Sequence, residues 1–398
     1  MSVQIVFPRE MIMDQRRSTE NLSTASGPGL SGASSHLAGA REGLRIAGVS
    51  HAFHNIPALQ DVSFDVAAGQ VVALLGPSGC GKSTLLRGIA GLLAPDRGEI
   101  TLDGRDLRRV PARLRSIGMV FQNYALFPHL TVAENIAYGL ACRRQARSEI
   151  AVQVAEMLRL VRLESFAKRL PRELSGGQQQ RVAVARALAI NPSALLLDEP
   201  FGALDRGLRA QLQDEFVRLQ RALGITTVMV THDQEEAQTV ADKLVVMNLG
   251  RVEQIGTPEE LYDRPISLFV NSFLGHANKF ATKVTGRTYG RTTLQLVDGQ
   301  TITLEHELSF MTGAEVKLTA RPEHLSIVSK GTDNTLDARW IRAAPLAHML
   351  SVDLELPDGT PVKALIERNT EPRPAPGSEV GLRLDLNSAH FFPQESEQ

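Results

Sequence analysis

The stretch Gly76-Pro77-Ser78-Gly79-Cys80-Gly81-Lys82-Ser83-Thr84 fits the phosphate-binding loop pattern G-x-x-x-x-G-K-[ST] at every fixed position. An apolar run at 71–75 predicts a buried strand before it, and residues from Lys82 to about Ala90 predict a helix after it. Glycines let successive backbone N–H groups face one hollow, to which the helix adds its positive end. We therefore predict that 76–84 bind a nucleotide, with Lys82 on the outer phosphates and the Ser83 hydroxyl on Mg²⁺.

Composition limits the class of protein. The 398 residues carry a net charge of −1, with 43% hydrophobic and 22% charged residues, which is typical of a soluble globular chain of two or three domains. Such a balance provides no field to attract nucleic acid. The two cysteines, Cys80 and Cys142, predict no disulfide framework and a reducing cytoplasm. No apolar run approaches a membrane helix and no secretory signal is seen, so we expect any membrane association to go through another protein.

The first two thirds of the chain predict a disordered tail followed by an α/β domain. Residues 1–42 form the predicted tail, because 18–40 consist mainly of Ser, Gly, Ala and Thr. Residues 43–278 form the predicted α/β domain, with a helical subdomain over about 128–190. Strands are expected at 44–53, 62–66, 99–102, 118–121, 194–198 and 226–231, with a hairpin at Asn248-Leu249-Gly250.

Two helix starts within the predicted helical subdomain carry capping signals. Thr131 and Glu134 predict a capping box. Ser148 is predicted to cap the amphipathic stretch 149–163.

Residues 279–398 change to short alternating strands, which predict a separate all-β, barrel-like domain. Hairpin turns are expected at Asp298-Gly299 and at Asp358-Gly359. The motif GAEVKL at 313–318 recurs as GSEVGL at 377–382, once after each hairpin, which indicates a duplication. Trp340 and His348 are interpreted as core or surface residues rather than as a ligand pocket.

Two further features predict chemistry. Ser175 and Gln178 form the S-x-x-Q capping box of a helix whose start is left bare by Gly176 and Gly177, which is a second place suited to an anion. The buried strand 194–198 ends in two carboxylates. Of these, Asp198 is predicted to support Mg²⁺, and Glu199 is predicted to face the γ-phosphate and polarise the attacking water.

The phosphate loop, the LSGGQ stretch at 174–178 and the LLLDE stretch at 195–199 resemble the nucleotide-binding subunit of ABC transporters over roughly residues 44–278. The resemblance implies a P-loop NTPase fold and further roles in ATP and Mg²⁺ binding. Phe53 stands where the family more often has Tyr and would stack on adenine. Gln122 would contact Mg²⁺ and water, Asp205 would cross a dimer interface, and His232 would contact the γ-phosphate.

The resemblance also implies that the active site is shared between two chains. In this family each ATP lies between the phosphate loop of one subunit and the LSGGQ helix of another, in a head-to-tail dimer. Catalysis would fall to Glu199, His232, Gln122 and Lys82 of one chain. The partner would contribute Ser175, Gly176, Gly177, Gln178 and Asp205. Because the sequence has one copy of each motif, a second nucleotide-binding subunit is required; we expect a homodimer, with a heterodimer left open.

The subfamily is indicated by three stretches. Residues 121–132 and 199–205 resemble importers of the maltose, polyamine, ferric-iron and sulfate group, and Arg321-Pro322-Glu323-His324 resembles their C-terminal OB-like TOBE domain. The resemblance implies an ATP-hydrolysing subunit of a binding-protein-dependent importer, peripheral on the cytoplasmic side of the inner membrane. Its partners would be two permease subunits, contacted near Gln122–Val132, and an external solute-binding protein. The apolar, aromatic stretch from Tyr124 to Val132, with Tyr124 and Phe127, is predicted to form the surface groove that takes a permease helix. A polyamine-, ferric-iron- or phosphonate-like solute is expected, polyamine first, and the TOBE domain is expected to dimerise rather than bind a regulator.

The sequence disfavours two other classes of nucleotide-binding protein. A soluble ABC ATPase of DNA repair or translation usually carries paired nucleotide domains or long coiled-coil insertions, and this sequence has neither. A GTPase would need Asn-Lys-x-Asp, and Asn278-Lys279-Phe280-Ala281 lacks the Asp. Within the phosphate loop, Cys80 is interpreted as a small spacer residue whose alkylation would inhibit the enzyme if its thiol is reactive.

Overall fold

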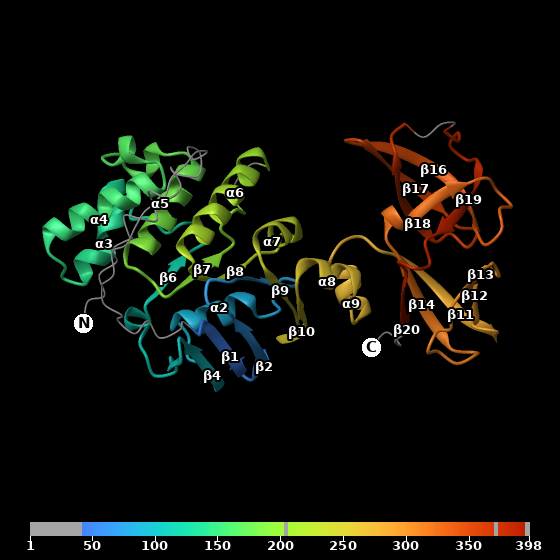
Figure 1. Ribbon diagram of the computed structural model, residues 1–398, viewed down its shortest axis with the longest axis horizontal. Helices are drawn as coiled ribbons and strands as arrows, with labels where there is room; N and C mark the ends of the chain where they lie inside the picture. The colour runs from blue at the N-terminus through green and yellow to red at the C-terminus, as the bar shows by residue number, and fades with distance from the viewer. Residues whose placement is uncertain (1–41, 203–205, 370–372, 395–398) are drawn as a thin grey trace, which may run out of the picture. The chain divides into compact units, whose positions relative to one another are not determined.

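The computed structural model describes residues 42–202, 206–369 and 373–394. The chain divides into two compact units, Met1–Pro258 and Glu259–Gln398, and each is described by itself (Figure 1). Apart from Glu42, the predicted tail lies outside the described residues.

The first unit is built on a six-stranded sheet with the order β10-β9-β3-β8-β7-β6. Neighbouring strands from β9 to β6 run parallel, and β10 pairs antiparallel with β9 through the predicted hairpin. All residues of β3 and β8 are buried, which explains their continuous apolar sequences. The strand bounds are Val71–Leu75 (β3), Ile117–Val120 (β6), Ala194–Asp198 (β7), Thr226–Val230 (β8), Lys243–Asn248 (β9) and Arg251–Gly256 (β10).

A second, antiparallel sheet has the order β2-β1-β4-β5. Its buried side chains share one hydrophobic core with β3 and with helix α2, Lys82–Ala90. The phosphate loop between β3 and α2 is therefore anchored on both sides by packed elements. The strands span Leu44–Phe53 (β1), Ile56–Val66 (β2), Arg97–Leu102 (β4) and Arg105–Asp106 (β5).

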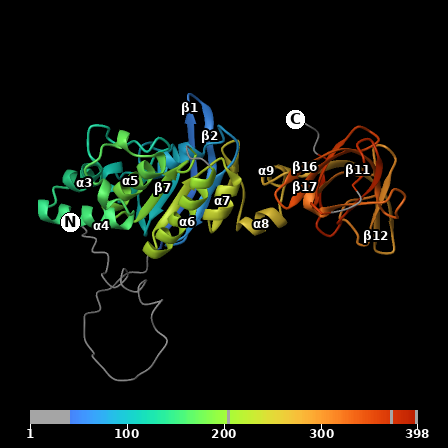
Figure 2. The same ribbon diagram turned by 90° about the horizontal axis from the view of Figure 1, so that it is seen from above.

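Three helices, α3 (Val132–Cys142), α4 (Arg147–Leu160) and α5 (Gly176–Ala189), pack together at the end of the unit away from β1 and β2 (Figures 1 and 2). The capping box at the start of α3 is confirmed, since the Glu134 N–H donates to Thr131 Oγ1 at 3.3 Å and the Thr131 N–H donates to Glu134 Oε2 at 2.7 Å. Helices α6 (Arg206–Leu223) and α7 (Gln234–Val240) complete the unit.

The predicted Ser148 cap is wrong. Helix α4 begins at Arg147, and Ala146 occupies the cap position without a side-chain hydrogen bond. The Ile150 N–H donates to the Ala146 carbonyl at 3.0 Å. The helix thus begins before Ser148, and the serine is exposed in the first turn.

The second unit consists mainly of two five-stranded antiparallel sheets, with the orders β13-β12-β11-β14-β20 and β15-β19-β16-β17-β18. The sheets share one core, in which Trp340 is 3% exposed, whereas His348 is at the surface. Both predicted hairpins, at 298–299 and 358–359, are confirmed. The strands are Asn278–Thr288 (β11), Arg291–Leu296 (β12), Thr301–Leu304 (β13), Glu315–Ala320 (β14), Leu325–Val328 (β15), Leu336–Leu346 (β16), Met349–Glu355 (β17), Pro361–Glu367 (β18), Glu379–Leu384 (β19) and His390–Pro393 (β20).

The duplication seen in the sequence extends to the sheets. Each copy of the repeated motif leads into an equivalent strand, β14 in one half and β19 in the other. The strand after each copy joins the opposite half: β15 follows β14 but pairs with β19, and β20 follows β19 but pairs with β14. The two halves thus exchange their last strands.

Helices α8 (Pro258–Asp263) and α9 (Leu268–Phe273) precede the sheets. Arg321, 1% exposed, lies with its guanidinium 3.5 Å from the ring centre of Tyr262 in α8 and donates to the Tyr262 carbonyl at 3.1 Å. The Tyr262 hydroxyl also bonds Glu323. These contacts place residues from Glu259 onward with the second unit, whereas the sequence analysis ended the first domain at residue 278.

Candidate functional site

The phosphate loop has a backbone that only glycine fits at two positions. A Cβ on Gly76 would lie 2.2 Å from the Met247 carbonyl oxygen of β9. At Gly81, φ is 103°, and a Cβ would lie 2.4 Å from the Ala58 carbonyl oxygen of β2. The pattern glycines are therefore required by close packing against two strands as well as by the turn itself.

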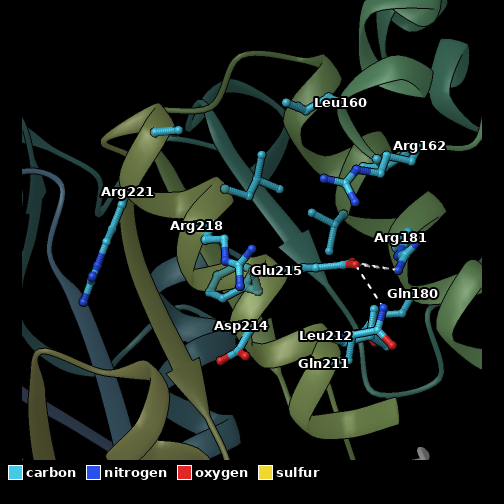
Figure 3. Close-up of a pocket in the computed structure, with 15 residues that line it drawn as sticks. Leu160, Arg162, Gln180, Arg181, Gln211, Leu212, Asp214, Glu215, Arg218 and Arg221 are labelled. Carbon is cyan, nitrogen blue, oxygen red and sulfur yellow. Dashed lines mark hydrogen bonds and ion pairs between the residues drawn. The ribbon is translucent and has the colours of Figure 1, made fainter. Parts of the chain in front are cut away.

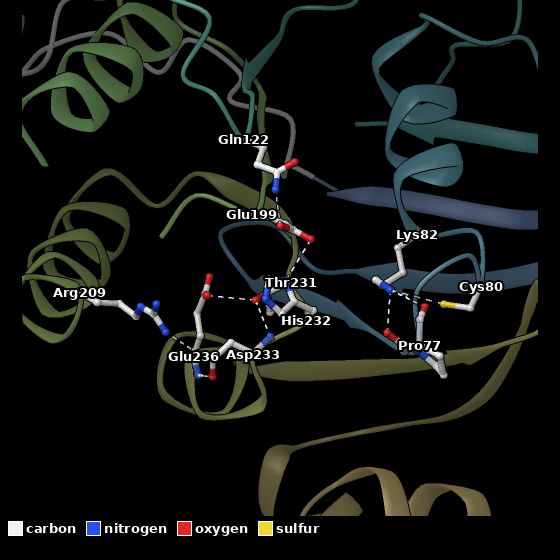
Figure 4. A network of polar contacts seen from close by, with 11 residues as sticks. Pro77, Cys80, Lys82, Gln122, Glu199, Arg209, Thr231, His232, Asp233 and Glu236 are labelled. Carbon is white, nitrogen blue, oxygen red and sulfur yellow. Dashed lines mark hydrogen bonds and ion pairs between the residues drawn. The ribbon is translucent and has the colours of Figure 1, made fainter. Parts of the chain in front are cut away.

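Lys82 folds back over this loop. Its ammonium donates to the carbonyls of Gly76 at 2.7 Å and Pro77 at 2.9 Å, and lies 3.6 Å from the Cys80 sulfur (Figure 4). Lys82 is 7% exposed and Cys80 is 4% exposed. The positive charge is thus held at the phosphate loop, and the Cys80 thiol is poorly accessible to an alkylating reagent.

A pocket of about 600 Å³ opens beside the loop, a size typical of small-ligand sites. It brings together predicted residues from distant parts of the sequence. Its walls come from the end of β1 with the aromatic Phe53, the start of β2, the phosphate loop, the residue after β7 and the segment after β8. The lining residues are Phe53, Ala58, Ser78, Gly79, Gly81, Lys82, Ser83, Thr84, Glu199 and His232.

Glu199 lies at the centre of the predicted catalytic residues, directly after β7. Its Oε2 accepts a hydrogen bond from Gln122 Nε2 at 2.7 Å, and its Oε1 lies 3.1 Å from His232 Nδ1 (Figure 4). The backbone has a φ of 47°, and its N–H donates to the Val230 carbonyl at 2.9 Å. Glu199 therefore contacts two of the other three predicted catalytic side chains, Gln122 and His232, and the third, Lys82, lines the pocket together with Glu199 and His232.

Asp198 is half-buried at the end of β7, and this partial burial raises the pKa of its carboxyl, with a further rise from the negative charge of Glu199. A hydrogen bond from the Ser83 hydroxyl and the nearby Arg87 charge act in the opposite direction. Two predicted Mg²⁺ ligands, Asp198 and Ser83, thus already touch. A hard divalent cation fits this oxygen-donor pair, because it would offset both the burial and the repulsion between the two acids.

The aromatic side chain of Phe53 is 45% exposed and lines the pocket. Two neighbours that no sequence pattern indicated hold this end of β1. His51 lies edge-on to Phe53 with ring centres 4.6 Å apart, and its Nδ1 is 3.2 Å from Asp96 Oδ1. Asp96 Oδ2 also accepts the Ala52 N–H at 2.8 Å. The sequence around Asp96 contains only turn signals, so nothing in it indicated this role.

The second predicted anion site is the start of α5. Its capping box is confirmed: the Gln178 N–H donates to Ser175 Oγ at 3.4 Å, and the Ser175 N–H donates to Gln178 Oε1 at 2.9 Å. Gly176 is exposed, whereas Gly177 packs against Leu212 and Leu208 of α6. Residues 175–178 do not line the pocket at the phosphate loop of this chain. Asp205, predicted to act with them, lies outside the described residues.

The stretch 121–132 differs in part from its prediction as an aromatic surface. Tyr124 is 6% exposed, and its carbonyl accepts from Arg186 Nη2 at 2.9 Å. Phe127 is half-buried, and its ring centre lies 4.3 Å from that of Tyr138, which is 45% exposed. The accessible aromatic face therefore consists of Phe127 and Tyr138, and Tyr124 serves the core beneath it.

A larger pocket of about 850 Å³ lies among α4, α5 and α6 (Figure 3). An ion pair crosses it, between Arg181 of α5 and Glu215 of α6, with a nitrogen–oxygen distance of 2.7 Å. Further charged side chains of both signs, including Asp214 and Arg218, line it. None of the predicted site residues lines this pocket.

The comparisons with known proteins agree with this geometry. Residues 59–202 match the family model of the ABC transporter domain, and residues 318–392 match that of the TOBE domain. The chain is 47% identical over 326 residues to the sulfate/thiosulfate import ATP-binding protein CysA of Thermosynechococcus vestitus, covering 82% of this chain and 91% of that protein. It is 46% identical over 290 residues to the spermidine/putrescine import ATP-binding protein PotA of Nitratidesulfovibrio vulgaris, covering 73% and 79%.

Among solved structures, cbiO1 from Clostridium perfringens, part of the ABC transporter complex cbiONQ, superposes with a TM-score of 0.53 at 31% identity, covering 56% of this chain and 92% of that one. The fold and the site thus define an ABC-type ATPase. Within that class, the chain belongs to the ATP-binding subunits of ABC importers that carry a C-terminal TOBE domain. The predicted fold class and ATPase activity coupled to import are confirmed, against the soluble ABC ATPase and the GTPase alternatives.

Proposed function

We propose that this chain hydrolyses ATP with Mg²⁺ in a head-to-tail dimer and so drives import of a small solute across the cell membrane. The observation that carries the proposal is the contact of Glu199 with both Gln122 and His232, at the wall of the pocket that Lys82 also lines. Side chains from three separate segments meet where the γ-phosphate of a bound nucleotide would lie. An ordinary strand end would not need this arrangement.

The residues divide the chemistry among them. Glu199 accepts hydrogen bonds on both oxygens and is the group placed to orient and deprotonate the attacking water. Lys82 and His232 stabilise the charge on the transferring phosphoryl group. Phosphoryl transfer needs mainly positioning and charge stabilisation from the protein, rather than a covalent intermediate. Ser83, Asp198 and the carbonyl oxygen of Gln122 would hold Mg²⁺, which neutralises phosphate charge when bound.

A partner chain is part of the proposal. The start of α5 presents a capped helix end with an exposed Gly176, yet it is absent from the pocket at this chain's own phosphate loop. A helix N-terminus of this kind suits an anion, and the γ-phosphate bound to a second copy is the anion proposed. Ser175 to Gln178 and Asp205 would then complete the partner's site, preferably in a homodimer.

Transport requires contact with membrane subunits. In the part of the chain that the structure describes, no helix is long and apolar enough to cross a membrane. We place the chain on the cytoplasmic side of the inner membrane, bound to two permease subunits that receive solute from an external binding protein. The exposed aromatic face of Phe127 and Tyr138 within and beside 122–132 suits a helix from a permease.

The variant Phe127→Ala should weaken permease binding and uptake while leaving the ATPase rate of the separate subunit at its original value, because Phe127 does not line the nucleotide pocket. Co-purification with the permeases and solute uptake are the measurements. Phe166→Ala is a matched control, since Phe166 lies beside Arg169 rather than in this face. Normal assembly of the Phe127→Ala complex would contradict the proposed contact.

The solute is proposed from the relatives. The alignment with the sulfate/thiosulfate protein covers more of both chains than the alignment with the polyamine protein, so we place sulfate or thiosulfate first and a polyamine second, with ferric-iron- and phosphonate-like solutes behind them. The test is uptake of radiolabelled sulfate and spermidine by a strain lacking this gene, with and without the restored gene. Restored uptake of only one solute identifies the cargo, and restoration of neither would contradict both assignments.

A further inference from the structure

His232 lies in the segment after β8, and its side chain is largely exposed, so little packing holds it in place. The imidazole is 64% exposed, and its recorded partner is Glu199, 3.1 Å from Nδ1. The direction of such a side chain is set mainly by the backbone of its own residue and the two on either side, Thr231 and Asp233. What holds these two residues therefore decides where the imidazole lies.

A buried acid holds them. Glu236, in the first turn of α7, is 2% exposed, and its Oε2 accepts the hydroxyl proton of Thr231 at an oxygen–oxygen distance of 3.0 Å. Its other oxygen, Oε1, is buried and has no hydrogen-bond partner among the residues that the structure describes. Glu236 therefore contacts Thr231 beside His232, but it does not line the pocket at the phosphate loop.

The cap of α7 explains why Glu236 takes this position. Asp233 is the N-cap, and its Oδ1 accepts the Glu236 N–H at 3.2 Å. In a D-x-x-E cap the glutamate usually reaches back to the N–H of the cap residue. Here the Asp233 N–H donates to Thr231 Oγ1 at 3.0 Å instead, and Glu236 bonds the same hydroxyl (Figure 4). The Thr231 hydroxyl therefore joins Glu236 to both ends of the loop that carries His232.

We infer that Glu236 is a positioning residue for ATP hydrolysis, which holds the loop 231–233 through the Thr231 hydroxyl and thereby keeps the His232 imidazole against Glu199. The inference rests on the proposed role of His232 in hydrolysis. Glu236 itself touches neither Glu199 nor the phosphate loop in any recorded contact. Its loss should thus act on the rate of the chemical step rather than on ATP binding.

The charge state of Glu236 supports this role. Burial is the main cause that raises the pKa of its carboxyl to about 7, with a smaller rise from the neighbouring Asp233, against the lowering effects of the Thr231 hydrogen bond and of the charges of Arg209 and His232. Arg209 is already paired with Asp233, with Nη1 2.7 Å from Oδ2. Below neutral pH the carboxyl is therefore uncharged, and glutamine reproduces both its shape and its hydrogen bond to Thr231.

The raised pKa of Glu236 makes the stability of the folded protein depend on pH. The unfolded chain titrates this group near its ordinary value of 4.5, so between there and about 7 the folded state binds the extra proton. Glu236 therefore lowers the stability of the folded protein progressively as the pH rises across this window, and the loss is complete above pH 7. Glu236→Gln lacks the titration, so the melting temperature of this variant relative to the wild type should rise from pH 5 to about pH 7 and stay constant from there to pH 8.

The test uses the full-length chain and the variants Glu236→Ala, Glu236→Gln, Thr231→Val, Thr231→Ser and Glu236→Ala/Thr231→Val, each first shown to be folded by its urea midpoint. We expect Glu236→Ala and Thr231→Val to lower the ATPase kcat about 10- to 100-fold with KM for ATP unchanged, the effect of misplacing a catalytic group. Glu236→Gln and Thr231→Ser should keep kcat near the wild-type value. The double variant should lose no more than Thr231→Val alone, because that substitution already removes the hydrogen bond that Glu236→Ala removes.

The outcomes separate the inference from the proposed function. If the wild-type chain has no ATPase activity, the proposed function fails and takes the inference with it. If the wild type is active but Glu236→Ala keeps its kcat, changes KM instead, or adds its loss to that of Thr231→Val, the inference alone is overturned. A melting-temperature difference between wild type and Glu236→Gln that does not change with pH would overturn it as well.

Discussion

The variant Glu199→Gln is expected to lower the ATPase kcat about 100- to 10,000-fold, the range that a general base contributes. The amide keeps the size of the side chain and can still accept the Gln122 hydrogen bond, but it cannot take a proton from water. ATP binding should persist, because Lys82 and the loop are untouched. Phosphate release and equilibrium binding of ATP, measured on the same preparation, check the two halves of this expectation.

The same variant should hold ATP between two chains. With hydrolysis blocked, the γ-phosphate remains as the shared ligand, so light scattering should show an ATP-dependent dimer that wild type forms only transiently. Glu235→Gln, the same chemical change at an exposed position on α7, is the matched control and should leave kcat unchanged. A Glu199→Gln enzyme that turns over normally would sink the role assigned to this carboxylate.

Mixing two inactive variants is expected to restore activity. Lys82→Ala removes the phosphate-binding cation, and Ser175→Arg removes the cap of α5 and crowds its exposed start, at a cost of about 1 kcal/mol in stability. In a head-to-tail heterodimer, one site combines the intact phosphate loop of the second variant with the intact helix start of the first. An equimolar mixture of homodimer-forming chains should recover about a quarter of the wild-type rate, since half the dimers are mixed and half of their sites intact.

The control for that mixture is Ser148→Arg, which places the same side chain at an exposed helical serine that caps nothing. It should be fully active alone. No recovery on mixing Lys82→Ala with Ser175→Arg, measured over a range of mixing ratios, would mean that each site is completed within one chain or by a different subunit.

The nucleotide site was predictable to the extent that short motifs dictate local geometry. The phosphate loop, the strand ending in Asp198 and Glu199, and the Ser175 cap each combine a backbone requirement with a chemical one, and the structure places them as their sequences indicate. The Ser148 cap prediction failed because α4 already begins with the hydrogen bond from the Ile150 N–H to the Ala146 carbonyl, which puts Ala146 at the cap position. A capping residue in the sequence does not exclude an earlier helix start.

Residues that act on the site through other residues were not predictable. Asp96 and His51 support the end of β1 that carries Phe53. Their contacts depend on the pairing of β1 with β4, which no local sequence pattern shows. Glu236 is an instructive case, since D-x-x-E after Thr231 predicts an ordinary cap. Only the structure shows that the glutamate turns to the threonine hydroxyl instead of to the cap N–H. Tyr124 was likewise assigned to a surface because its burial depends on the packing beneath it.

The exchange of last strands in the C-terminal unit has a consequence for synthesis. Leu318 in β14 pairs with Phe391 in β20, so the first half of the duplication leaves the ribosome with β14 lacking one neighbour. Until residues 390–393 are made, that strand presents an open edge, and another nascent copy can pair with it. The pairing of β14 with β20 is also expected to form slowly, because the two strands are far apart in the sequence. The halves of the duplication cannot mature one after the other, and folding of the whole unit waits for its final strand.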